Sequence, residues 1–236
     1  MTSSDSGVDT SSSPFQEYDI RFKTPFTCLL AGPTQSGKTS VIFNILRERH
    51  IMMDVPTDNI IYFYNRWQPS FTRFKEENIV TDWIGELPSI ELLEEMTSPY
   101  KNGNGSIIVI DDFMTQLNSD ISDLFTLLCH SNRISIFLLT QNVFSKNPFF
   151  RTISLNSQYV FIFKNSRDSS QITNYARQFA PTNTRWVVEA FRTCTKSAYS
   201  YMMFDHHNKT EEEVRVRSHM LRNEWPVRVW MLRGRS

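Results

Sequence analysis

One octapeptide constrains the fold of this 236-residue chain more than any other feature. Residues 32–39 read GPTQSGKT and fit the pattern G-x-x-x-x-G-K-[ST] in full. An apolar run precedes the octapeptide and a segment with helical periodicity follows it, so we expect a loop between a strand and a helix. Its glycines let backbone N–H groups point at phosphate oxygens, and the helix N-terminus adds a favourable dipole. The predicted phosphate-binding residues are Gly32, Pro33, Thr34, Gln35, Ser36, Gly37, Lys38 and Thr39.

Two residues of this loop have predicted chemical roles. Lys38 would reach the β- and γ-phosphates of a nucleoside triphosphate, and the Thr39 hydroxyl would ligate Mg²⁺. The alternative is a Gly-containing turn with an incidental lysine. The strand before the loop and the helix after it argue against that alternative.

A second motif consists of four apolar residues followed by two carboxylates, in IIVIDD at residues 107–112. A buried strand of this kind delivers its last side chains to the same sheet edge as the phosphate-binding loop. We expect Asp111 to hold Mg²⁺, directly or through water, and Asp112 to polarise the attacking water. The alternative is a strand that ends in an Asx turn.

Two further features concern hydrolysis. Gln141 follows the apolar run LLT at residues 138–140, where a neutral amide could bond the γ-phosphate or the attacking water; the alternative is a loop glutamine. Hydrolysis is often accelerated by an arginine from a neighbouring subunit, by roughly 10³–10⁵ in rate. The candidates are Arg133, slightly preferred, then Arg151, with Arg167 also open.

Short apolar runs alternate with helical segments along the chain. Strands are predicted at residues 26–31, 59–64, 106–110, 134–140 and 159–163, and helices at 38–49, 119–128 and 168–179. This alternation predicts an α/β fold, a P-loop NTPase of the ASCE type, with a mainly parallel sheet covered by helices on both faces. Residues 199–204 and 214–217 could form a C-terminal β-hairpin.

Composition sets the domain boundaries and the compartment. We expect a disordered leader at 1–17, one ATPase domain at 18–218 and an Arg-rich tail at 219–236. Lys+Arg and Asp+Glu are both 25, so net charge neither indicates nor excludes a nucleic-acid partner. Three widely spaced cysteines favour a reducing compartment. No apolar run approaches membrane-spanning length and no signal peptide is evident, so we expect an intracellular protein that is not secreted and has no membrane partner.

Beyond these motifs, longer blocks resemble a known family. They are GPTQSGKT at 32–39, IIVIDDFM at 107–114, ISIFLLTQNVF at 134–144, RTISLNSQYVFIFKNSRD at 151–168 and QITNYARQFAP at 171–181. The chain resembles the viral genome-packaging ATPases of the FtsK–HerA superfamily, of the poxvirus type found in Maverick/Polinton elements and adintovirus-like viruses. Relatives often carry a basic residue one place before Arg133, where this chain has Asn132, which leaves the arginine assignment open.

The resemblance implies an ATP-driven motor that moves double-stranded DNA into a preformed capsid. It implies a homo-oligomeric ring, a pentamer or hexamer, with a capsid or portal vertex as partner. The expected location is the nucleus or viral factory of the host, with a transient stay at the virion vertex. By position, Lys38 and Thr39 are Walker A residues, Asp111 and Asp112 are Walker B residues, and Gln141 is the sensor.

Two other functions remain as alternatives. One is a P-loop helicase or DNA-transfer ATPase that acts on nucleic acid outside packaging. The other is a nucleotide-gated scaffold that assembles without translocating. The pair Asp111 and Asp112, together with Gln141, disfavours the scaffold, since it needs no water-positioning carboxylate.

Overall fold

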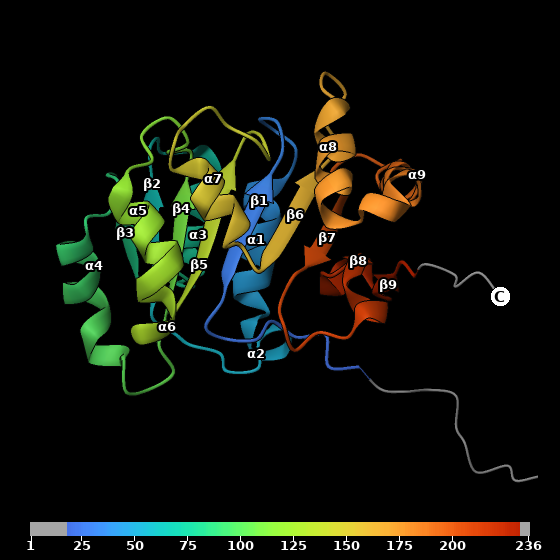
Figure 1. Cartoon of the computed structure of the whole chain (residues 1–236). Helices are drawn as coiled ribbons and strands as arrows, with labels where there is room; N and C mark the ends of the chain where they lie inside the picture. The colour runs from blue at the N-terminus through green and yellow to red at the C-terminus, as the bar shows by residue number, and fades with distance from the viewer. Residues whose placement is uncertain (1–17, 232–236) are drawn as a thin grey trace, which may run out of the picture.

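A nine-stranded sheet forms the centre of the molecule (Figure 1). The computed structural model describes residues 18–231, so the predicted leader at 1–17 and the last residues of the predicted tail, 232–236, lie outside the described part of the chain. The strands are β1 (Thr27–Ala31), β2 (Ile60–Tyr64), β3 (Asp82–Ile84), β4 (Ser106–Asp111), β5 (Ile134–Thr140), β6 (Tyr159–Phe163), β7 (Tyr201–Asp205), β8 (Val216–Ser218) and β9 (Arg228–Val229).

The strand order is β3-β2-β4-β5-β1-β6-β7-β8-β9. Strands β1 to β6 pair in parallel, and β7, β8 and β9 add to the β6 side in antiparallel fashion. The mainly parallel sheet predicted from the sequence is therefore confirmed. The predicted C-terminal hairpin is also present, because Met203 pairs with Arg217 and Phe204 with Val216 across β7 and β8.

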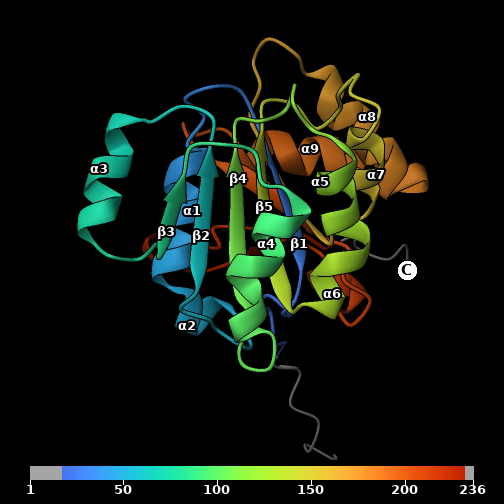
Figure 2. The same cartoon turned by 90° about the vertical axis from the view of Figure 1, so that its left-hand side faces the viewer.

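Helices cover both faces of the sheet, as Figure 2 shows. On one face lie α1 (Lys38–Arg47), α2 (Arg49–Met52) and α3 (Pro69–Glu76). On the other lie α4 (Ile90–Thr97), α5 (Ser119–Asp123), a π-helical turn (Leu124–Leu128), α6 (Cys129–Ser131), α7 (Phe150–Leu155), α8 (Ser170–Phe179) and α9 (Thr184–Cys194). Within residues 18–231, no helix combines the length and apolarity needed to span a bilayer.

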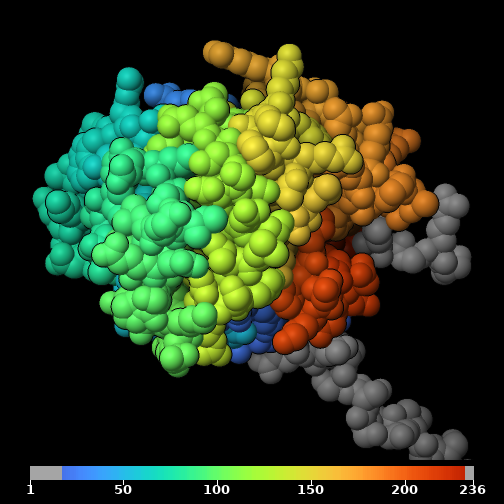
Figure 3. Space-filling model, turned by 60° about the vertical axis from the view of Figure 1, so that its left-hand side comes forward, coloured from blue at the N-terminus to red at the C-terminus, as the bar shows by residue number. Residues whose placement is uncertain are grey.

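The central strands separate two hydrophobic cores. In β1, Leu29 packs into the core under α4 to α9, whereas Cys28 and Leu30 pack into the core under α1 to α3. Because both faces are covered, these strands are buried along their length and mostly apolar, which is why they appear as continuous apolar runs in the sequence. Figure 3 shows the outer surface of α4 and α5 in green beside α7 in yellow and α8 in orange.

The sequence patterns did not predict several helices and strands. The stretch 70–96, whose order was unclear, contains most of α3 together with β3 and most of α4. The predicted helix at 119–128 is α5 followed by the π-helical turn, and it continues into α6. Helices α7 and α9 were not anticipated, although α9 buries Val187, Ala190, Phe191 and Cys194 at helical spacing.

The C-terminal segment belongs to the sheet. Glu224 Oε2 accepts a hydrogen bond from the Tyr201 hydroxyl at 2.7 Å, and Trp230 Nε1 donates to Ser218 Oγ at 2.9 Å. Strand β9 extends the sheet beyond β8. The sheet therefore continues across the boundary at residue 218 that was drawn from charge and composition.

A buried ion pair links β7 and β8. The Arg217 guanidinium donates to Asp205 Oδ2 and, at 2.7 Å, to the carbonyl of Ile20 before β1. Both side chains are almost fully buried. Burial raises the pKa of Asp205 and lowers that of Arg217, while each charge partly offsets the shift of the other.

We expect Arg217→Met to lower the free energy of unfolding by about 3–5 kcal/mol, because it leaves Asp205 buried without its counter-ion. Urea denaturation would measure the loss. Arg185, paired with Glu189 on the exposed surface of α9, supplies the matched control, and Arg185→Met should leave the midpoint close to that of the unmodified chain. Equal effects of the two substitutions would contradict a special stabilising role for the buried Arg217–Asp205 ion pair.

Candidate nucleotide-binding site

The phosphate-binding loop lies between the end of β1 and the start of α1, at the carboxyl edge of the parallel strands. Gly32 opens it and donates its N–H to the Thr140 carbonyl of β5 at 3.1 Å. A Cβ at Gly32 would lie 2.5 Å from Phe163 Cβ, so a larger residue would displace the chain. Gly37 has φ of 98°, a backbone conformation that favours glycine. The structure thus explains both glycines of the motif: Gly32 has no room for a side chain, and Gly37 has a positive φ.

Lys38 begins α1 and folds back over the loop. Its Nζ donates to the carbonyl oxygens of Gly32 at 2.6 Å and Pro33 at 3.0 Å. Burial lowers the pKa of Lys38, and the nearby carboxylates of Asp111 and Asp112 oppose that shift. The ammonium group is therefore held at the loop, partly shielded from water and near both predicted Walker B residues.

Asp111 ends β4 with a buried side chain. The hydroxyl of Tyr62, on the neighbouring strand β2, donates to Asp111 Oδ2 at 2.8 Å. Burial raises the pKa of Asp111 to about 6, and the Tyr62 hydrogen bond and Lys38 both act in the opposite direction. The sequence analysis missed Tyr62, for which the signal was a tyrosine inside an otherwise apolar strand.

Asp112 turns its exposed carboxylate toward Gln141. It has φ of 66°, and Gln141 Nε2 lies 3.5 Å from Asp112 Oδ1. Asn65 fixes the turn, because its N–H donates to the Asp111 carbonyl at 3.2 Å and its Nδ2 to the Asp112 carbonyl at 3.0 Å. The strands β4 and β5 thus place Asp112 and Gln141 side by side at the edge that carries the loop.

These residues share one cleft of about 860 Å³. Its walls include Thr34, Gln35, Ser36, Gly37, Lys38, Thr39, Arg66, Asp111, Asp112, Gln141, Tyr199, Leu221, Asn223 and Glu224. A further observation suits a phosphate ligand, since the Ser36 hydroxyl is buried without a hydrogen-bond partner. Arg66, after β2, is a cationic wall residue that the sequence analysis did not assign to the nucleotide.

The oxygen donors of this cleft suit a magnesium ion. Thr39 offers a hydroxyl and Asp111 a carboxylate, the ligand types that Mg²⁺ takes alongside water and substrate phosphates. Within residues 18–231 no three His, Cys, Asp or Glu side chains gather as metal ligands. A magnesium site here would therefore depend on the nucleotide for part of its shell.

The predicted arginines do not line this cleft. Arg133 precedes β5, at the amino edge of the sheet and opposite the phosphate-binding loop, where its Nη1 donates to the Gly103 carbonyl at 2.8 Å. Arg151 in α7 and Arg167 after β6 are exposed. Arg133, at the opposite edge, would need a second subunit to contact a nucleotide in the cleft.

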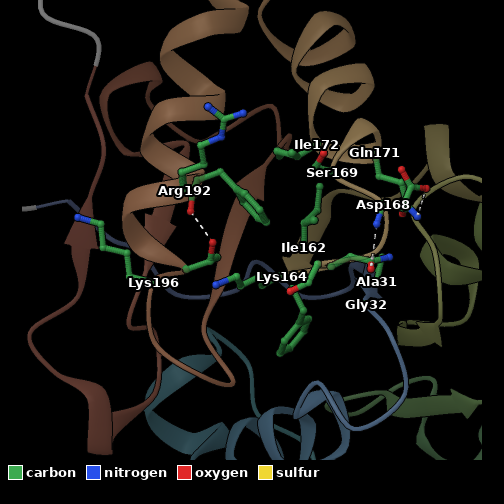
Figure 4. A pocket seen from close by; sticks show the side chains of 15 residues that line it. Ala31, Gly32, Ile162, Lys164, Asp168, Ser169, Gln171, Ile172, Arg192 and Lys196 are labelled. Atoms are coloured by element: carbon green, nitrogen blue, oxygen red, sulfur yellow. Dashed lines mark hydrogen bonds between the residues drawn. The ribbon is translucent and has the colours of Figure 1, made fainter.

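A second, smaller cleft of about 320 Å³ lies beside Gly32, between β6, α8 and α9 (Figure 4). Three basic residues line it: Lys164, Arg192 and Lys196. Asp168 is the acidic residue of the wall, and Gln171 Nε2 donates to its Oδ2 at 2.9 Å. The cleft therefore has an excess of positive charge.

A phosphate-binding loop with its lysine, and two aspartates at the end of β4, meet at the carboxyl edge of a parallel sheet. This combination of features is typical of the P-loop NTPases. No protein-family model matches the sequence, and no curated protein matches it. Solved structures do resemble the fold.

One is the genome packaging NTPase of Sulfolobus turreted icosahedral virus 2, solved with ATPγS. It is 14% identical with a TM-score of 0.51, and the match covers 87% of this chain and 97% of that one. A KaiC-like protein of Pyrococcus horikoshii is 12% identical with a TM-score of 0.44, covering 83% of this chain and 85% of that one. The cytoplasmic domain of the type VII secretion ATPase EccC of Thermomonospora curvata is 14% identical with a TM-score of 0.49, covering 95% of this chain and 28% of that one.

The likeness to the packaging NTPase runs over nearly the full length of both chains. It bears out the P-loop NTPase fold predicted from the sequence.

Proposed function

We propose that this chain is an ATPase that hydrolyses ATP in the cleft between the phosphate-binding loop and the ends of β4 and β5. The observation that carries the proposal is the placement of Asp112 and Gln141 together in the cleft that Lys38 also lines. A protein that binds a nucleotide without hydrolysing it would need no carboxylate and amide placed to contact the terminal phosphate and the attacking water.

Each residue has a defined task in this reaction. The Lys38 ammonium exchanges its hydrogen bonds to the loop carbonyls for oxygens of the β- and γ-phosphates. Asp112 accepts a hydrogen bond from the attacking water and aligns it with the γ-phosphorus. Gln141 holds Asp112 and bonds the water or the γ-phosphate with its neutral amide. Backbone N–H groups of the loop compensate the negative charge of the phosphates.

Magnesium would be held by Thr39 and Asp111 and would neutralise charge on the phosphate oxygens. The nearby positive charge would favour the ionised form of Asp111, against the effect of its burial. Tyr62 keeps one oxygen of that carboxylate hydrogen-bonded and so fixes its orientation.

We further propose that ATP hydrolysis drives double-stranded DNA into a preformed capsid. The resemblance in the sequence and the shared fold with a viral packaging NTPase support this proposal. The motor would be a ring, a pentamer or hexamer, in which Arg133, Arg151 or Arg167 of a neighbour could complete the site. It would work in the nucleus or viral factory and at the capsid or portal vertex.

The second cleft offers a place for DNA phosphates. Lys164, Arg192 and Lys196 line it, and none of them forms an ion pair with another described residue. Contacts of basic side chains with phosphates are independent of base sequence, as a packaging motor requires.

The test is the ATPase rate with and without DNA. We expect double-stranded DNA to raise the rate more than single-stranded DNA, and the apparent DNA affinity to fall steeply between about 50 and 200 mM salt. The double variant Lys164→Ala with Lys196→Ala should weaken DNA binding. Lys101→Ala, at the opposite edge of the sheet, is the matched control. Stronger stimulation by single strands would instead favour a helicase or DNA-transfer ATPase.

A further inference from the structure

The nucleotide cleft has a second end, away from Asp112 and Gln141. Its walls there come from two segments near the C-terminal strands: Tyr199, just before β7, and the stretch 221–224, after β8. In the sheet, β7 and β8 lie on the side of β1 opposite to β5 and β4. The phosphate-binding loop therefore lies between the end with Asp112 and Gln141 and the end with the Tyr199 ring.

Tyr199 lies directly beside the loop. A Cβ built on Gly37 would be 3.3 Å from Tyr199 Cβ and 3.5 Å from Cδ1, so the tyrosine side chain flanks the first turn of α1. The residue is nevertheless 70% exposed. A large aromatic side chain at the mouth of a cleft is a surface for a flat ligand rather than part of the core.

The backbone of Tyr199 is also unusual. Its φ is 62°, in the left-handed region that bulky residues rarely adopt. This conformation costs free energy, and the exposed ring recovers little of it by burial. Residues held in such conformations concentrate at ligand sites, where the surrounding structure positions them.

The segment that completes this end of the cleft is fixed in place. Glu224 Oε2 accepts hydrogen bonds from the Tyr201 hydroxyl at 2.7 Å and from the Leu221 N–H at 3.3 Å. Leu221 is buried, and Asn223 remains exposed in the cleft. The space beside Tyr199 is thus bounded by a second wall that the fold holds.

We propose that Tyr199 is the platform on which the adenine ring of bound ATP stacks. This rests on the proposed nucleotide binding. The end of the cleft with Asp112 and Gln141 suits the water that attacks the terminal phosphate. The nucleoside must then extend from the loop toward the opposite end, where Tyr199 presents its ring. Every base has a π-face that can stack on an aromatic side chain.

The test compares two probes, ATP and inorganic tripolyphosphate, each with Mg²⁺, by calorimetric titration of the full chain. We expect Tyr199→Ala to weaken ATP binding by about 5- to 150-fold, the range for loss of one base–aromatic stack. Tripolyphosphate has no base, so its affinity should be the same as for the unmodified chain. Tyr199→Phe should retain the affinity for ATP, because the ring remains.

The exposed Tyr100, at the amino edge of the sheet, is the matched control, and Tyr100→Ala should not change either affinity. An unchanged ATP affinity in Tyr199→Ala would overturn the stacking inference but leave the proposed ATPase function intact. Equal losses for ATP and tripolyphosphate would also overturn it, since the ring would then only support the loop at Gly37. Failure of the unmodified chain to bind ATP would overturn the proposed function as well.

Discussion

Lys38→Ala is expected to abolish measurable ATP hydrolysis. The substitution removes the only described lysine that lines the nucleotide cleft, and with it the ammonium that would contact the β- and γ-phosphates. Loss of one such electrostatic contact typically costs about 10²–10³ in rate, and weaker nucleotide binding adds to that loss. A steady-state phosphate-release assay at saturating ATP and Mg²⁺, with ATP affinity measured in parallel, would show both effects.

Two controls separate chemistry from folding in this experiment. Lys38 donates to the Gly32 and Pro33 carbonyls, so the thermal midpoint of Lys38→Ala must be compared with that of the unmodified chain. Lys101→Ala removes an exposed lysine from the opposite edge and should hydrolyse ATP normally. A stable Lys38→Ala variant with an unchanged rate would rule out the cleft as the site of hydrolysis.

Asp112→Asn should separate binding from hydrolysis. The amide keeps the size of the side chain, but it is a much weaker proton acceptor than the carboxylate, so the attacking water is no longer activated. Loss of a general base costs about 10²–10⁴ in rate. ATP affinity should stay the same or rise, because a negative charge near the phosphates is removed. Single-turnover hydrolysis and an equilibrium binding titration would measure the two quantities.

Asp120→Asn, in the first turn of α5, provides the matched control for charge removal. It should leave the rate unchanged, because Asp120 does not line the cleft. A normal rate in Asp112→Asn would show that another group orients the water. Parallel loss of ATP binding and hydrolysis in that variant would instead place Asp112 among the residues that hold the nucleotide.

The predicted center of the site follows from local sequence patterns. The loop residues are contiguous, and the Asp111–Asp112 pair and Gln141 each follow an apolar run. In a parallel sheet such run ends meet at one edge, so their proximity could be inferred without knowledge of the strand order. The structure places Lys38, Asp112 and Gln141 around one cleft for this reason.

Other parts of the site depend on pairings that local patterns do not contain. Tyr62 reaches Asp111 because β2 pairs with β4, and Tyr199 reaches Gly37 because β7 adds to the sheet in antiparallel fashion. Arg133 is a different case. It precedes a parallel strand, so its position at the edge opposite the loop could have been derived from the sequence. Short helices such as α7 lack enough residues for a clear period.

The position of Gly32 matters for the basic cleft as well as for the nucleotide site. Gly32 begins the phosphate-binding loop, accepts the Lys38 hydrogen bond and also forms part of the wall of the basic cleft, in tight contact with Phe163. Gly32 thus connects the loop that would bind the phosphates with the wall of the basic cleft. Release of the Gly32 carbonyl by Lys38 on nucleotide binding would therefore act directly on the wall of the basic cleft.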